Sequence, residues 1–180
     1  MKSRRIVVRV VVLLFVMIGL LWLMGGRTYS WNRSFETTAA PGRVFACLTE
    51  PESISQWMSG IDSIEPLTDF GPAIGARNKI TVERRDGDLV MEQEILAYEQ
   101  DQLLRVSIDS PSVLITNIYS LEPFGEQTRV RQQTQVSYRG FARLFAPFLG
   151  TDFQQQLERD QTSLKQLVEK QPAPALDETS

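Results

Sequence analysis

Four amide side chains stand out as groups able to do chemistry, because each interrupts a segment in which apolar residues alternate with polar ones. They are Asn78, Gln93, Asn117 and Gln132. A buried amide without a hydrogen-bond partner costs about 1–3 kcal/mol, so buried amides bond to one another, to water or to a ligand. A few polar groups in an apolar wall are typical of small-molecule sites. The pattern therefore predicts ligand-binding groups, with mutual hydrogen bonding or exposure at strand ends as the alternatives.

Catalytic groups are much harder to find in this sequence. The chain of 180 residues has no histidine, which removes the usual general base and the usual metal ligand. Cys47 is the only cysteine, so no internal disulfide or CxxC site can form, and its apolar neighbours predict a small buried hydrophobe. Tyr98, Tyr119 and Tyr138 could serve as acids, but no pattern distinguishes one of them. The residues identify no catalytic group, no metal site and no cofactor site.

Five apolar rows surround the amides and are typical of half-buried strands. A slip of one residue in register would turn a row outward, so each row is an expectation about one face of a sheet. Acidic residues such as Glu92 and Glu94 alternate with the rows and are expected to face solvent. The rows are Ala76, Asn78, Ile80 and Val82; Leu89, Met91, Gln93 and Ile95; Leu104, Val106 and Ile108; Val113, Ile115, Asn117 and Tyr119; and Val130, Gln132, Thr134 and Val136.

Other elements must position these rows. Residues 29–36 alternate as a first strand, and Pro41 and Pro51 each begin a short helix, the second ending near Trp57. Short turns such as Asp86-Gly87 then join the remaining strands into an antiparallel meander. After Gly140 the apolar spacing of three and four predicts one long helix, bent or interrupted near Pro147 and Gly150. Its inward stripe is expected to be Phe141, Phe145, Leu149, Phe153 and Leu157.

The N-terminus predicts a membrane anchor over residues 6–26. Residues 1–9 carry four basic side chains and no acid, and the uncharged run that follows, extended back to Ile6, reaches the length of about 20 residues that spans a bilayer. A cleaved signal peptide is the alternative, although its apolar core is usually about 7–15 residues and Leu23 or Met24 fits poorly before a cleavage site. The positive-inside rule places the N-terminus in the cytoplasm and the soluble domain on the extracytoplasmic side.

Charge and composition divide the chain into three parts. Residues 1–27 are the basic segment and single-pass anchor, residues 28–170 form one domain, and residues 171–180 are expected to be a disordered tail. Beyond residue 9 the chain has 15 basic and 22 acidic residues, a net charge of −7. Such an acidic domain without a basic stripe argues against nucleic acid as a partner.

Three stretches of sequence resemble one known superfamily. They are AAPGRVFACLTEPESISQWMSGIDSIE at 39–65, YSLEP at 119–123 with TRVRQQTQV at 128–136, and SLKQLVE at 163–169. Together they resemble the START-related, polyketide cyclase/dehydrase-like superfamily, known as SRPBCC, over about residues 30–170. The resemblance implies an α+β helix-grip fold. In that fold a curved antiparallel sheet of about seven strands wraps around a long C-terminal helix, and two short helices follow the first strand.

The same resemblance implies a cavity between the sheet and the long helix, which Trp57 would either plug or line. The first functional hypothesis is a membrane-anchored binding module for a hydrophobic or amphipathic, lipid-like small molecule. The alternatives are a cyclase/dehydrase-like enzyme acting on a hydrophobic substrate, for which no catalytic residue can be carried over, and a non-catalytic envelope interaction domain. The expected ligand-binding residues are Trp57, Asn78, Ile80, Met91, Gln93, Val106, Asn117, Tyr119, Gln132, Phe145 and Phe153.

Overall fold

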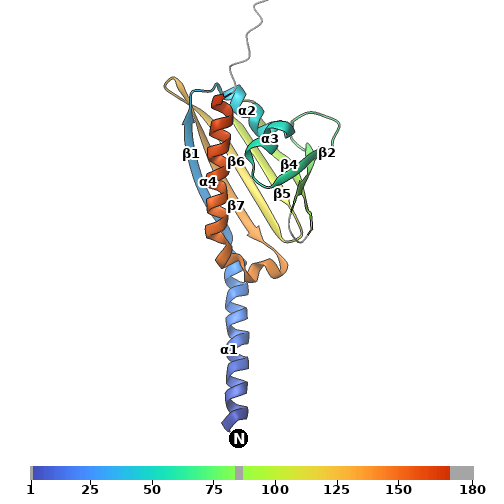
Figure 1. Cartoon of the computed structure of the whole chain (residues 1–180), viewed down its shortest axis with the longest axis vertical. Coiled ribbons are helices and arrows are strands. Elements are labelled where there is room, and N and C mark those ends of the chain that lie inside the picture. The colour runs from blue at the N-terminus through green and yellow to red at the C-terminus, as the bar shows by residue number, and fades with distance from the viewer. Residues whose placement is uncertain (1, 84–86, 171–180) are drawn as a thin grey trace, which may run out of the picture.

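The computed structural model describes residues 2–83 and 87–170, with side chains from Ile6 onward. The predicted Asp86-Gly87 turn lies partly outside the described residues, and the predicted tail at 171–180 lies wholly outside them. A single antiparallel sheet of seven strands dominates the fold, in the order β1-β7-β6-β5-β4-β3-β2 (Figure 1). The strands are β1 (Thr28–Thr37), β2 (Ile61–Pro66), β3 (Arg77–Val82), β4 (Leu89–Glu99), β5 (Leu103–Asp109), β6 (Val113–Phe124) and β7 (Gln127–Tyr138).

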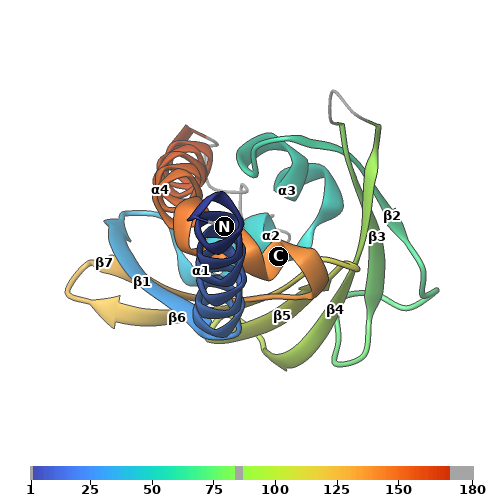
Figure 2. The same ribbon diagram turned by 90° about the horizontal axis from the view of Figure 1, so that it is seen from below.

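Apart from the N-terminal helix, the helices lie on one side of this sheet. Figure 2, viewed from the end of the N-terminal helix, shows the sheet curving around α2, α3 and α4. The predicted α+β helix-grip architecture, with two short helices after the first strand, is therefore confirmed. The helices are α1 (Lys2–Gly25), α2 (Pro41–Thr49), α3 (Pro51–Trp57) and α4 (Ala146–Lys170), with a 3-10 turn η1 (Gly140–Leu144) before α4.

The apolar rows occupy the concave face, as predicted. In β7 the buried positions are Thr128, Val130, Gln132, Thr134, Val136 and Tyr138, and the residues between them are partly or fully exposed. The same alternation runs through β4, β5 and β6. Because successive strand residues point to opposite faces, burial on alternate positions fixes which face meets the helices.

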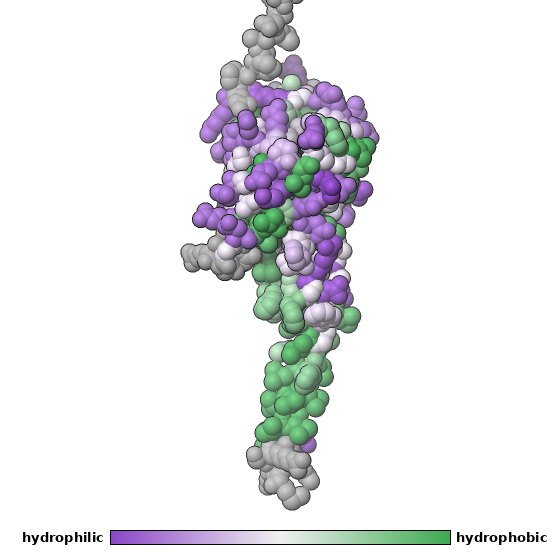
Figure 3. Space-filling model, turned by 90° about the vertical axis from the view of Figure 1, so that its right-hand side faces the viewer, coloured by the Kyte–Doolittle hydropathy of each residue, from purple (hydrophilic) through white to green (hydrophobic). Residues whose placement is uncertain are grey.

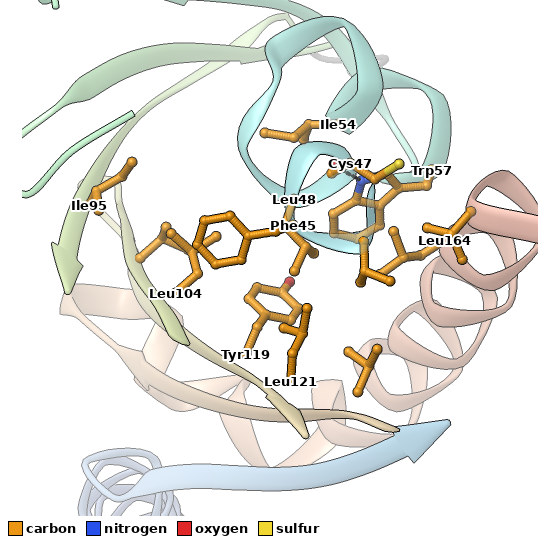
Figure 4. Packing of buried hydrophobic residues seen from close by; sticks show 14 of the residues in the cluster. Phe45, Cys47, Leu48, Ile54, Trp57, Ile95, Leu104, Tyr119, Leu121 and Leu164 are labelled. Atoms are coloured by element: carbon orange, nitrogen blue, oxygen red, sulfur yellow. Dashed lines mark hydrogen bonds between the residues drawn. The ribbon is translucent and has the colours of Figure 1, made fainter. Parts of the chain in front are cut away.

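The core fills the part of the concave face under α2 and α3. Val44, Phe45 and Leu48 from α2 pack against Leu104 and other sheet residues (Figure 4). Pro41 and Pro51 begin the two short helices, where the missing proline N–H would have had no intrahelical partner. Cys47 is 2% exposed within this cluster, which confirms it as a buried hydrophobe, and burial raises the pKa of its thiol.

The long helix begins later than the sequence pattern predicts. A helix continuous from Phe141 would need the Pro147 nitrogen to donate to the Arg143 carbonyl, and proline has no N–H. The chain instead forms η1 after Gly140, whose φ is 53°, and starts α4 at Ala146. Phe141 and Phe145 are consequently 81% and 60% exposed, so the prediction that they face the interior is wrong. The buried stripe of α4 is Ala146, Leu157, Asp160, Leu164 and Val168.

The N-terminal helix projects from one end of the domain (Figure 1). Its segment Ile6–Gly25 has 20 residues and a mean hydropathy of 2.9, long and apolar enough to cross a membrane, and a signal sequence has the same properties. Only Gly26 and Arg27 separate α1 from β1. Gly25 packs so closely on the backbone of Arg143 that a Cβ atom there would clash with the Arg143 carbonyl.

Candidate functional site

A cavity of about 250 Å³ lies between the sheet and α4. An apolar cavity of about 150 Å³ is large enough to bind benzene, and pockets for drug-sized ligands span about 300–1,000 Å³. The cavity therefore suits a small molecule or one end of a larger one. Its lining residues are Trp57, Met58, Ser59, Ile61, Val82, Leu89, Met91, Ile108, Val113, Ile115, Asn117, Tyr119, Gln132, Phe153, Gln156, Leu157 and Asp160.

Trp57 both packs in the core and lines the cavity. Its indole Nε1 donates a hydrogen bond of 2.9 Å to the Cys47 carbonyl, and the side chain is 4% exposed (Figure 4). In a continuing helix that carbonyl would accept from residue 51, which is Pro51 and has no N–H. The indole therefore takes the place of the missing backbone donor. A leucine there would fill less of the space and could not satisfy the carbonyl.

One side of the cavity is deeply buried and another is partly exposed. Asn117, Tyr119 and Gln132 are each at most 7% exposed, whereas Leu89 and Val113 are only partly buried. Val113 pairs with Tyr138, next to the pair of Ser137 with Thr28 at the start of β1. The open side of the cavity thus extends to the end of the sheet from which α1 leaves.

The four predicted amides bond within the protein. Asn78 donates through Nδ2 to the Gln93 Oε1 at 2.9 Å, and these two residues are direct cross-strand partners. Gln132 donates through Nε2 to the Thr134 hydroxyl at 3.2 Å and to the Tyr119 hydroxyl at 3.4 Å. The Thr134 hydroxyl in turn donates to the Asn117 Oδ1 at 2.7 Å.

These bonds correspond to the mutual hydrogen bonding considered as an alternative at the sequence level. Asn117 and Gln132 nevertheless line the cavity, and the three bonds do not use the Asn117 Nδ2 or Gln132 Oε1 atoms. The network therefore fixes the two amides while leaving one donor group and one acceptor group outside it. A ligand hydroxyl could bond to either group, and a ligand carbonyl could accept from the Asn117 Nδ2.

A buried carboxylate, Asp160, also lines the cavity, and the sequence analysis missed it. It is 7% exposed and accepts a hydrogen bond of 3.0 Å from the Ser59 backbone N–H and a second from the Ser59 hydroxyl. Burial raises the pKa of this carboxyl, while the Ser59 bonds act in the opposite direction. The signal was present in the sequence, because Leu157, Asp160 and Leu164 share the three-and-four spacing of one helix face.

Tyr119 completes the polar end of the cavity. It is 2% exposed, and burial followed by the negative charge of Asp160 raises the pKa of its phenol well above the ordinary range. The phenol thus stays protonated and can serve as a donor, and the Asp160 carboxyl supplies acceptor oxygens. The described residues contain no group of three or more Cys, Asp or Glu side chains placed to hold a metal ion.

The structure brings six of the predicted site residues together around the cavity and leaves five outside its lining. Ile80, Gln93 and Val106 are buried on the concave face, in sheet positions that are already packed, and Asn78 lies beside Gln93. Phe145 lies outside the cavity because the chain bends at η1. The cavity occupies only part of the concave face, bounded by α4 and by residues 57–61, and strand alternation alone does not locate it. The six lining residues are Trp57, Met91, Asn117, Tyr119, Gln132 and Phe153.

Comparisons with known proteins agree with this geometry. A family model described as "Polyketide cyclase / dehydrase and lipid transport" matches residues 29–169. No curated protein matches the sequence. The solved structure of Ara h 8.0201 superimposes with a TM-score of 0.64 at 15% identity, covering 79% of this chain and 98% of that chain.

Two bacterial structures are similar in the same way. A putative uncharacterized protein from Rhizobium leguminosarum gives a TM-score of 0.62 at 16% identity, covering 81% of this chain and 98% of that one. Protein MLL2253 from Mesorhizobium loti gives 0.54 at 23% identity, with 79% and 96% covered. At these identities the likeness establishes the fold alone.

Proposed function

Because the chain belongs to the polyketide cyclase/dehydrase and lipid transport family, we propose that it binds a small hydrophobic or amphipathic molecule between its sheet and α4. The observation that carries this proposal is the cavity of about 250 Å³ with apolar walls and a polar end. Leu89, Met91 and Phe153 supply apolar contacts toward the open side. Asn117, Gln132 and Tyr119 supply the few oriented polar groups that fix a ligand's position in such sites.

The polar end also limits the chemistry of the ligand. Asp160 brings a carboxyl group to this end of the cavity, and a ligand carboxylate beside it would be disfavoured because two acids in a poorly solvated space do not readily ionise together. An uncharged hydroxyl, carbonyl or amide can instead bond to the Asn117 and Gln132 amides. The preferred ligand is therefore an apolar molecule with an uncharged polar end, and not a fatty-acid anion.

The proposal includes a retained anchor at residues 6–26. The apolar segment Ile6–Gly25 follows a basic N-terminus, as in single-pass proteins whose N-terminus stays in the cytoplasm. The domain then lies on the extracytoplasmic side. The open side of the cavity extends toward α1, which would keep it near a supply of lipid-like molecules.

Native mass spectrometry of the full chain, released from a mild detergent after expression in membranes, tests the binding proposal. We expect a discrete added mass that is lost on denaturation. Ile115→Trp should abolish it by filling the cavity, and Thr116→Trp, on the opposite face of β6, should retain it. An added mass that survives in Ile115→Trp, or no added mass after incubation with a lipid extract, would contradict binding in this cavity.

A second candidate function is catalysis, which the pairing of Asp160 with Tyr119 in one cavity favours. Titratable groups with displaced pKa values cluster at catalytic sites, although structural groups show such shifts too. An enzyme would convert the captured molecule, and Asp160→Asn would slow that conversion while preserving capture. Asp152→Asn, on an exposed position of the same helix, is the matched control. Unchanged ligand mass after prolonged incubation would leave binding as the function.

A further inference from the structure

A second apolar surface lies outside the cavity, where η1 meets α4. We call it the base patch, and it consists of Phe141, Phe145, Phe148 and Leu149. The three phenylalanines are 81%, 60% and 69% exposed, and Leu149 is 38% exposed. Isolated apolar side chains on a surface need no explanation, but four within nine residues form a contiguous patch that normally marks an interaction site.

The base patch is held next to the C-terminal end of α1. Gly25 packs directly on the Arg143 backbone, which leaves no room for a side chain. The Arg143 guanidinium lies 5.7 Å from the Trp22 ring, and its Nε donates to the Tyr138 carbonyl at 3.2 Å. Figure 3 shows apolar surface continuing from α1 onto the adjoining base of the domain. The patch and the apolar helix therefore form one continuous surface.

The length of α1 sets the position of this surface relative to the bilayer. Its 20-residue segment Ile6–Gly25, apolar apart from Arg9 near the start, extends about 30 Å at 1.5 Å per residue, which equals the hydrocarbon thickness of a bilayer. Gly25 then lies at the edge of the hydrocarbon, and the η1 backbone packed on it lies at the same level. Only Gly26 and Arg27 precede β1, so the linker is too short to lift the domain away from the membrane.

We propose that the base patch inserts into the interfacial layer of the bilayer that α1 spans, so that η1 and the first turn of α4 form a second membrane contact. The occupant of the patch is lipid, because the patch adjoins the membrane-spanning helix. Phe and Leu side chains bury at the boundary of headgroups and acyl chains in interfacial helices. The Arg143 guanidinium lies near Trp22 and Arg27 is exposed just after α1, so both basic residues belong to the level of the lipid phosphates. The inference rests on the retained anchor of the proposed function.

Site-directed spin labelling of the full chain in phosphatidylcholine vesicles tests the inference. In a Cys47→Ala background, labels are placed by Phe141→Cys, Phe145→Cys and Phe148→Cys, and accessibility to oxygen is compared with accessibility to a water-soluble nickel complex. Phe124→Cys is the control, since Phe124 is 44% exposed at the opposite end of the sheet. Leu13→Cys, in the middle of α1, reports the anchor separately.

We expect the three patch labels to favour oxygen over nickel, at a shallower depth than the Leu13 label, and the Phe124 label to favour nickel. Patch labels that favour nickel while the Leu13 label is embedded would overturn the inference and leave the anchor intact. Patch labels shielded from both reagents would show a protein partner on the patch, which also overturns it. A Leu13 label that favours nickel would refute the anchor and the inference together.

Discussion

Replacing Trp57 by phenylalanine should destabilise the domain by more than the change in side-chain size alone. The smaller ring removes the indole donor from the Cys47 carbonyl, which is buried and which Pro51 cannot serve. A buried group left without its partner costs about 1–3 kcal/mol. The lost apolar contacts add about 1 kcal/mol, by analogy with the removal of one buried methylene group. We therefore expect the free energy of unfolding to fall by about 2–4 kcal/mol.

Urea unfolding of the full chain in mild detergent, followed by circular dichroism, measures this change. Trp22→Phe is the matched control, because Trp22 is 41% exposed on α1 and lies outside the domain core. Trp57→Leu should cost at least as much as Trp57→Phe, because it lacks the donor and also fills less space. A loss below about 0.5 kcal/mol for Trp57→Phe would refute the reasoning, because the carbonyl would then need no indole donor.

Three further predictions concern single groups. Because burial raises the pKa of the Asp160 carboxyl, the native state binds its proton more tightly than the unfolded chain does, and this contribution to stability is largest at low pH. The contribution falls as pH rises from about 4 through the native pKa of Asp160. The unfolding free energy of the Asp160→Asn variant should therefore lose this pH dependence, whereas that of the Asp152→Asn variant should retain it. Cys47 should react with a water-soluble thiol reagent only in denaturant, because it is 2% exposed and burial raises its pKa; rapid reaction in buffer would contradict its packing. Gly140→Ala should cost about 1–2 kcal/mol in urea unfolding, because φ is 53° there, and Gly71→Ala, where φ is not positive, should cost little.

Strand alternation predicted the concave face well because it depends only on neighbours along the chain. The row Val113, Ile115, Asn117 and Tyr119 faces the interior as predicted, since one buried face imposes a period of two. The two short helices were predictable for a similar local reason, because Pro41 and Pro51 mark their first turns.

The hydrogen-bond network needed information that no single segment contains. The Asn117 pair with Thr134 and the Tyr119 pair with Gln132 depend on the register between β6 and β7. Register is set jointly by two strands and their turn, so the sequence offered the amides as candidates without their partners. Asp160 was overlooked because a carboxylate on a helix is usually solvated, and its burial depends on the Ser59 turn packing against α4.

The interior stripe of the long helix was predicted too far toward the N-terminus for a physical reason. Periodicity continues through Phe141 and Phe145, but hydrogen bonding cannot continue through Pro147. The spacing of apolar residues therefore predicted correctly that residues 141–149 are amphipathic. It predicted wrongly that their apolar side chains pack against the sheet. In the structure the side chains of Phe141 and Phe145 are exposed, on a segment whose backbone packs against α1, instead of lying inside the sheet.

The two-residue link between α1 and β1 limits the range over which the domain can act. Gly26 and Arg27 span at most about 7 Å even when fully extended, so an anchored domain stays within one molecular layer of its own membrane. Such a protein cannot carry a ligand across an aqueous compartment to a second membrane. With the proposed anchor retained, its ligands would come from its own bilayer or reach it through the adjoining solution, and transfer to a second membrane would require another carrier.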